Sequence, residues 1–390
     1  MRRHLPALLV FAAVLAPSVA HADEGLWPFD MVPKDAIAKA HGVTLDDKWL
    51  EHVRLSTVRI SAGGTGSFVS GTGLILTNHH VASDCISQIG SASHNYMDEG
   101  FYAARDGGEA KCPNLAVDVL VGMEDVTDKV RAAKGTLSDA EANVAMKSKM
   151  GELEKACTDK NQAAQKQDGV SARCEVVTLY AGGKYHLYTY TRYTDIRLVF
   201  APEAGIAFFG GDPDNFTYPR FDLDMALFRA YADNKALAPQ HFLKWSTQGP
   251  KDGEVTFVSG NPGTTRRLAT MSQLEQLRDL TYARALESLK RERDLLKELS
   301  GQGHEYEREA REGIFDVENS IKALTGYLGG LKDPALMKIK KDDEAAMQKA
   351  IDADPKLKAQ YGTTLADVAK VQSQMPKLYP TYSAMERIGD

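Results

Sequence analysis

The sequence predicts a β part followed by an α-helical part, and three observations lead to this prediction. Up to about residue 267, short apolar alternations are punctuated by glycine, which is typical of antiparallel strands. After Arg267, apolar residues recur at three- and four-residue steps, as they do on one face of a helix. The length of 390 residues corresponds to about two domains. We therefore expect a β-rich domain over residues 23–267 and an α-helical domain over residues 268–390.

Nine segments of the first part have the length and alternation of strands. They are Thr57–Ile60, Ser67–Ser70, Leu74–Thr77, Ala116–Val121, Glu175–Tyr180, His186–Tyr193, Arg197–Phe200, Met225–Tyr231 and Val255–Val258. Glycines supply turns between them, at Gly63-Gly64, Gly71-Thr72-Gly73, Gly182-Gly183 and Gly210-Gly211. A helical insertion over Thr136–Lys160 interrupts the strands, with Ser138 and Asp139 as capping residues.

Four segments of the second part have helical periodicity. They are Leu268–Leu299, Glu305–Tyr327, Pro334–Ile351 and Leu365–Gln374. Their apolar stripes indicate the core of a helical bundle rather than a membrane or cofactor surface.

Charge and the N-terminal segment limit the possible partners. The net charge is −6 and no cluster of Lys and Arg has the form of a phosphate-binding patch, which argues against nucleic acid. Arg2 and Arg3 precede an apolar run over Leu5–Ala16 and a small-x-small site at residues 20–22, as in a secretory signal peptide. We expect residues 1–22 to be cleaved, leaving a periplasmic or secreted protein without a membrane anchor.

Four cysteines, Cys85, Cys112, Cys157 and Cys174, are an even number in a chain expected to be exported. Four cysteines allow three pairings, and joining nearest neighbours along the chain closes two loops of moderate length. No C-x-x-C spacing suggests zinc. We expect two structural disulfides.

The segment from Ser67 to His80 is the sharpest chemical feature. A short strand and a glycine turn lead to a second apolar strand, and two histidines follow it. A rigid strand end is a suitable place for a general base. Adjacent residues of an extended chain point to opposite faces, so only one of His79 and His80 can line a given site. This argues against a metal held by both rings, and we expect no metal or cofactor.

A histidine base needs a buried carboxylate to orient its ring. Asp224 begins the apolar strand that includes Met225–Tyr231, and Asp222 lies closer to the preceding loop. We take Asp224 as the partner, although a lone Asp at the start of a strand is more often a turn residue.

Four ordered motifs extend this pattern. Residues 67–80 read S-F-V-S-G-T-G-L-I-L-T-N-H-H, residues 23–28 read D-E-G-L-W-P, residues 210–220 read G-G-D-P-D-N-F-T-Y-P-R and residues 259–266 read S-G-N-P-G-T-T-R. The first resembles the histidine hairpin of chymotrypsin-like serine peptidases. Together the four resemble the bacterial periplasmic dipeptidyl aminopeptidases typified by dipeptidyl-peptidases 7 and 11, over residues 23 to about 330.

The resemblance implies the first half of a chymotrypsin-like antiparallel β-barrel followed by an α-helical lid domain. It implies removal of dipeptides from the free N-terminus of peptide substrates, with His80 as general base and Asp224 orienting it. By position, Asn215 and Phe216 bind the substrate's amine and backbone, and Asn319 is matched to a further asparagine of this clamp.

The sequence departs from the family pattern at three places. Val81 and Gly64 replace both cysteines of one family disulfide, and Phe216 replaces a tryptophan. The family's nucleophilic serine follows a glycine in a second barrel, and no such motif is present here. Neither Ser70 nor Ser259 has a preceding glycine to shape an oxyanion hole.

We therefore expect the sequence to be truncated before that barrel and to be nearly inactive by itself. The alternatives are a catalytically dead peptide-binding protein and an interaction protein that uses the helices from Leu268 to Gln374. An unpaired half-barrel would expose its packing face, so we also expect poor solubility or a homodimer.

Overall fold

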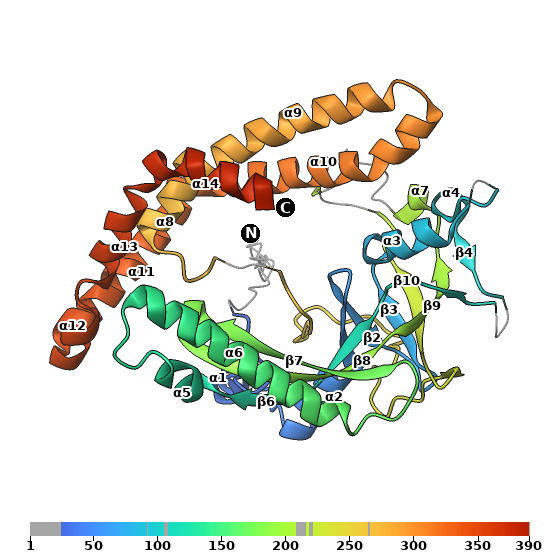
Figure 1. Cartoon of the computed structure of the whole chain (residues 1–390), viewed down its shortest axis with the longest axis horizontal. Helices are drawn as coiled ribbons and strands as arrows, with labels where there is room; N and C mark the ends of the chain where they lie inside the picture. The colour runs from blue at the N-terminus through green and yellow to red at the C-terminus, as the bar shows by residue number, and fades with distance from the viewer. Residues whose placement is uncertain are drawn as a thin grey trace, which may run out of the picture.

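The computed structural model describes residues 25–91, 93–104, 108–207, 216–217, 221–263 and 266–389. The expected signal peptide and the expected turn at Gly210-Gly211 lie outside these residues. In the described part, an antiparallel sheet is followed by a series of helices (Figure 1). The predicted mixed β and α class is therefore confirmed.

The described strands form one antiparallel sheet in the order β4-β9-β10-β3-β2-β1-β6-β8-β7, and β5 and β11 pair with β9 and β10. The strands are β1 Thr57–Ile60, β2 Thr65–Phe68, β3 Leu74–Thr77, β4 Phe101–Tyr102, β5 Ala110–Lys111, β6 Val117–Asp125, β7 Val170–Leu179, β8 Lys184–Tyr193, β9 Asp195–Ala201, β10 Ala226–Ala232 and β11 Lys235–Ala236. Eight of the nine predicted strands overlap one of them.

The ninth prediction, a strand over Val255–Val258, is wrong. These residues are in no strand, and the side chain of Val258 is 98% exposed. The segment is held instead by an edge-on contact of Phe257 with Trp49 and by a hydrogen bond between the hydroxyls of Ser259 and Thr57. Alternation alone cannot form a strand where no neighbouring strand supplies hydrogen bonds.

Seven α-helices and one 3₁₀ turn belong to the described β part. They are α1 Lys34–His41, α2 Asp47–Ser56, α3 His79–Ile89, α4 Tyr96–Glu99, α5 Thr127–Ala132, α6 Asp139–Gln162, η1 Tyr180–Gly182 and α7 Ala204–Ala207. The predicted insertion corresponds to α6, which begins with a capping box between Ser138 and Glu141.

The main core lies between the sheet and α3. Its fully buried side chains include Ile60, Phe68, Ile75, Leu198 and Phe228. From α3, Ala82, Cys85 and Ile86 enter the same core. A disulfide joins Cys85 to Cys112, and a second joins Cys157 to Cys174, which is the nearest-neighbour pairing. Helix α3 is thus fixed on the sheet by apolar packing and by a covalent bond.

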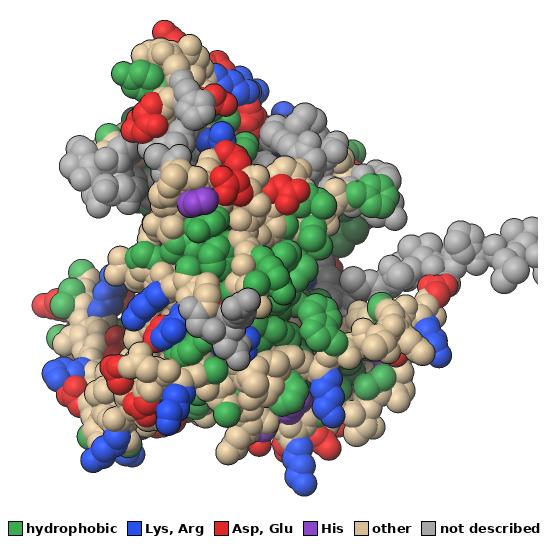
Figure 2. All heavy atoms as spheres, turned by 90° about the vertical axis from the view of Figure 1, so that its right-hand side faces the viewer, with side chains coloured by type: hydrophobic (Ala, Val, Ile, Leu, Met, Phe, Trp, Pro, Cys, Tyr) green, Lys and Arg blue, Asp and Glu red, His purple; other side chains and the backbone are tan. Residues whose placement is uncertain are grey.

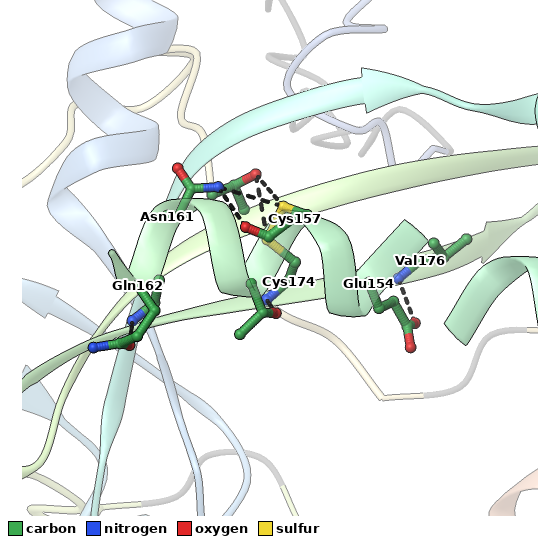
Figure 3. The surroundings of a disulfide bond; sticks show 9 residues. Glu154, Cys157, Asn161, Gln162, Cys174 and Val176 are labelled. Carbon is green, nitrogen blue, oxygen red and sulfur yellow. Dashed lines mark hydrogen bonds between the residues drawn. A yellow bond between two sulfur atoms is a disulfide. The ribbon is translucent and has the colours of Figure 1, made fainter. Parts of the chain in front are cut away.

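Helix α6 covers the hydrogen-bonding edge of β7, the last strand of the sheet (Figure 3). Alternate N–H groups of β7 donate to α6 side chains that are four residues apart: Ala172 to Gln162 at 2.8 Å, Cys174 to Thr158 at 3.0 Å and Val176 to Glu154 at 2.7 Å. Four helical residues rise about 6 Å and two strand residues about 6.6 Å, so the spacings match. These three N–H groups of β7 are therefore hydrogen-bonded by side chains of α6, and the Cys157–Cys174 disulfide joins α6 to β7.

The helices after residue 267 are α8 Met271–Gln276, the π-helical turn η3 Leu277–Thr281, α9 Tyr282–Ser300, α10 His304–Lys332, α11 Pro334–Ala353, α12 Pro355–Tyr361, α13 Thr364–Gln372 and α14 Met375–Gly389. The single helix predicted over Leu268–Leu299 is thus divided by the π-helical turn. Helices α9 and α10 form an antiparallel hairpin packed through Leu286, Val317 and Ile321. An ion pair of 3.0 Å between Arg311 of α10 and Asp98 of α4 connects this hairpin to the β part.

No helix among the described residues combines the length and apolar character needed to cross a bilayer.

Candidate active site

The β2–β3 hairpin delivers the two histidines to the start of α3. Asn78 is the N-cap residue, and His79 and His80 are the first two helical residues. The residue His79 is 2% exposed, whereas the side chain of His80 is 54% exposed. One ring is therefore buried and the other is half exposed. The two side chains diverge because they lie in the first turn of a helix, and not because the chain is extended.

Strand β10 brings Asp224 to His80. In the antiparallel pairing of β10 with β3, Ala226 lies opposite Thr77. Residues just before β10 therefore lie beside residues just after β3. Asp224 Oδ2 lies 2.8 Å from His80 Nδ1, and Asp224 Oδ1 accepts the backbone N–H of His80 at 3.1 Å. Of the two aspartates considered, Asp224 is the one whose carboxylate contacts the His80 ring.

Asn78 completes the surroundings of this carboxylate. Its side-chain amide donates to Asp224 Oδ2 at 3.0 Å and to the Asp224 backbone carbonyl at 3.1 Å. Sequence reasoning missed this residue, because its partner Asp224 lies 146 residues away along the chain. Its position directly before the two histidines was the available signal.

Electrostatics keep the Asp224 carboxylate ionised. Burial is the largest influence and raises its pKa, but hydrogen bonds from the ring and backbone of His80 and from Asn78 outweigh it, so the pKa lies below its ordinary value. The Asp224 side chain is only 12% exposed, which strengthens these interactions. His79 differs, since burial lowers its pKa and outweighs the raising influences of Asp224 and of the Pro202 backbone. We infer that His79 is neutral and structural.

The ring nitrogen Nε2 of His80 accepts no hydrogen bond from another described residue. The serines considered from the sequence are engaged elsewhere: Ser70 Oγ lies 3.1 Å from Thr72 Oγ1, and Ser259 Oγ lies 2.8 Å from Thr57 Oγ1. All four cysteines are in disulfides. Among the described residues, no group of three or more His, Cys, Asp or Glu side chains is placed to hold a metal ion.

The predicted amine clamp is described only in part. Asn215 lies outside the described residues. Phe216 is 61% exposed and has a φ of 61°, in the left-handed region that a bulky residue rarely adopts. Asn319 is an exposed residue of α10. Among the described residues, no hydrogen bond links Phe216 to His80 or Asp224.

The positions of the missing family disulfide are neighbours. A Cβ atom added to Gly64 would lie 2.8 Å from Val81 Cγ2. The side chain of Val81 therefore occupies the space in which the family pattern places a disulfide.

Comparison with known proteins identifies relatives of the whole arrangement. The family model described as Peptidase S46 matches residues 22–389. The chain is 33% identical over 291 residues to the Asp/Glu-specific dipeptidyl-peptidase of Porphyromonas gingivalis, covering 70% of this chain and 40% of that protein. It is 29% identical to dipeptidyl-peptidase 7 of Phocaeicola vulgatus, covering 95% of this chain and 54% of that protein.

A solved structure agrees with these matches. The crystal structure of Porphyromonas endodontalis DPP11 in complex with substrate superposes with a TM-score of 0.76 at 25% identity, covering 91% of this chain and 53% of that one. The chain spans about half the length of the relatives it matches.

Proposed function

Because the chain belongs to the peptidase S46 family, we propose that it carries the acid–base pair of a serine-type dipeptidyl aminopeptidase, which removes dipeptides from the free N-terminus of peptides. The observation that carries this proposal is the contact of 2.8 Å between His80 Nδ1 and Asp224 Oδ2, with Nε2 left without a described partner. The names of the relatives support the same reaction class.

The contact gives His80 the form that a general base needs. When Nδ1–H donates to Asp224, the neutral ring carries its lone pair on Nε2. In the proposed reaction, Nε2 takes the proton of a serine hydroxyl as it attacks the substrate carbonyl, and then gives it to the leaving amine. The ionised Asp224 stabilises the imidazolium formed between these steps. The serine is neither Ser70 nor Ser259, whose hydroxyls are bonded elsewhere.

Restriction to dipeptides requires a group that binds the substrate's free amine. We assign this role to Asn215, Phe216 and Asn319, because an amide oxygen can accept from an ammonium group and an aromatic face can stack on one. We further propose that the protein is exported after loss of residues 1–22. Its two disulfides suit an oxidising compartment.

The substrate class is tested on a polypeptide that contains both this chain and the nucleophilic serine. A decapeptide is supplied with a free or an acetylated N-terminus, and products are followed by mass spectrometry. We expect successive loss of two residues from the free peptide and no change in the acetylated one. Cleavage of both at equal rates, or cleavage at internal bonds, would overturn the proposal.

A binding function without hydrolysis is the second candidate. The observation in its favour is that no serine or cysteine of the described chain hydrogen-bonds to the His80 ring. Calorimetry with the same two peptides distinguishes the candidates. Binding of the free peptide alone, with no cleavage over days, supports the binding protein, whereas dipeptide release supports the peptidase.

A further inference from the structure

The side chain of Asn78 does not do what its position predicts. Asparagine is among the best N-cap residues because its oxygen accepts an N–H of the first helical turn. Asn78 is the N-cap of α3, yet its side chain forms no such hydrogen bond. It acts as a donor instead, to the carboxylate and the backbone carbonyl of Asp224.

Asp224 takes over the capping role from 144 residues away. Its Oδ1 accepts the N–H of His80, the second residue of α3. The helix start therefore supplies a backbone donor and a partial positive charge to this carboxylate. In return, the carboxylate satisfies one N–H group that would otherwise need a local cap.

The segment Asn78–His80 consequently holds both oxygens of Asp224. Oδ1 accepts one backbone N–H, and Oδ2 accepts from the His80 ring and from the Asn78 amide. Without the amide, both remaining donors would belong to His80, and Oδ2, the oxygen that contacts the ring, would have no other described donor to hold it in place. An acceptor at position 78 would also compete with Asp224 for the N–H groups of the helix.

We propose that Asn78 is a positioning residue, which directs the Asp224 carboxylate onto His80 Nδ1 by giving up its own cap. The catalytic consequence rests on the proposed function. The structural consequence does not, because the protonated nitrogen of the His80 ring can be observed without any substrate.

Two substitutions separate positioning from helix stability. Asn78→Ser keeps a good N-cap residue, so α3 should remain folded, but its hydroxyl ends closer to the backbone than the amide does. Asn78→Asp also keeps a good cap and has the size of asparagine, but it places a second carboxylate beside Asp224. Asn95→Ser is the matched control, since Asn95 caps the neighbouring helix α4 in the ordinary way by accepting from Met97 N–H.

The test is NMR of the chain with ¹⁵N-labelled histidine rings, with the His80 signals identified by their absence in His80→Ala. We expect the wild type and Asn95→Ser to show a low-field Nδ1 proton and the Nδ1–H tautomer. Asn78→Ser should weaken that proton signal and raise the fraction of Nε2–H, and Asn78→Asp should do so more strongly. An unchanged tautomer and Nδ1 signal in both Asn78 variants would overturn the positioning role.

Kinetics provide the second readout. For the active enzyme, Asn78→Ser should lower kcat about 10- to 100-fold with little change in KM, because orientation and not substrate binding is lost. A loss confined to KM would overturn the catalytic consequence. If no variant hydrolyses peptides but the His80 signals respond as expected, the proposed function fails and the positioning role stands.

Discussion

At the scale of single residues, the candidate site consists of the His80 imidazole and the Asp224 carboxylate. His79 and His80 are adjacent, yet one is buried in the core and the other is half exposed. The strand ends in the sequence indicated the two histidines and Asp224, and the choice of His80 over His79 came from the family resemblance. The sequence was not sufficient to find Asn78, because the partner of that amide lies 146 residues away.

The pairing of Asp224 predicts a pH dependence of stability. Because the pKa of Asp224 is lowered in the folded protein, its contribution is present above the ordinary value of 3.8 and is lost as the pH falls below it. Asp224→Asn should therefore lower the free energy of unfolding at pH 7 by about 1–3 kcal/mol. In urea denaturation, the difference from the wild type should narrow between pH 4 and pH 2. A difference that is constant over this range would contradict the assignment.

At the scale of elements, strands were predicted better than helices in the β part. The alternation in β3 and β8 reports directly which side chains enter the core. Helix α3 was missed because the two histidines were interpreted as the end of the strand Leu74–Thr77, and only Asn78 separates that strand from the helix. The strand predicted at Val255–Val258 failed for the converse reason, since a good local pattern had no described strand to pair with.

The two disulfides allow a matched experiment on α3. Each closes a loop, with sequence separations of 27 and 17 residues, so removing either should cost about 3 kcal/mol of unfolding free energy. Only Cys85–Cys112 fixes the helix that carries His80. Replacing Cys85 and Cys112 by alanine should therefore reduce dipeptide release more than replacing Cys157 and Cys174, with stability measured in parallel. Equal losses of activity at equal stability would contradict this role of α3.

At the scale of the whole molecule, apolar surface is prominent. Figure 2 shows hydrophobic side chains gathered across the middle of the face on which α3, α4 and β4 lie. Among the exposed large apolar residues, Phe221 is 89% and Val258 is 98% exposed. Exposed apolar surface was expected from the sequence because an unpaired half-barrel exposes its packing face, but the residues that form this surface were not predicted.

This exposure predicts self-association of the chain. Because monomeric proteins rarely leave large apolar patches in water, the apparent mass by light scattering should rise with concentration. The double substitution Phe221→Ser and Val258→Ser should reduce the rise. Val144→Ser, at a 70% exposed position of α6, is the control and should not. A monodisperse, cooperatively melting monomer at all concentrations would contradict the prediction.

The central claim, that His80 and Asp224 act together as the acid–base pair of a dipeptidyl aminopeptidase, is tested most directly by the rate of dipeptide release from one free peptide. We expect His80→Ala and Asp224→Asn each to lower kcat/KM by about 10³-fold or more. Ser83→Ala, which removes only a hydrogen bond to the His80 carbonyl, should stay within a few-fold of the wild type. No release by a wild-type polypeptide that also contains the nucleophilic serine, or an undiminished rate in His80→Ala of that polypeptide, would contradict the account.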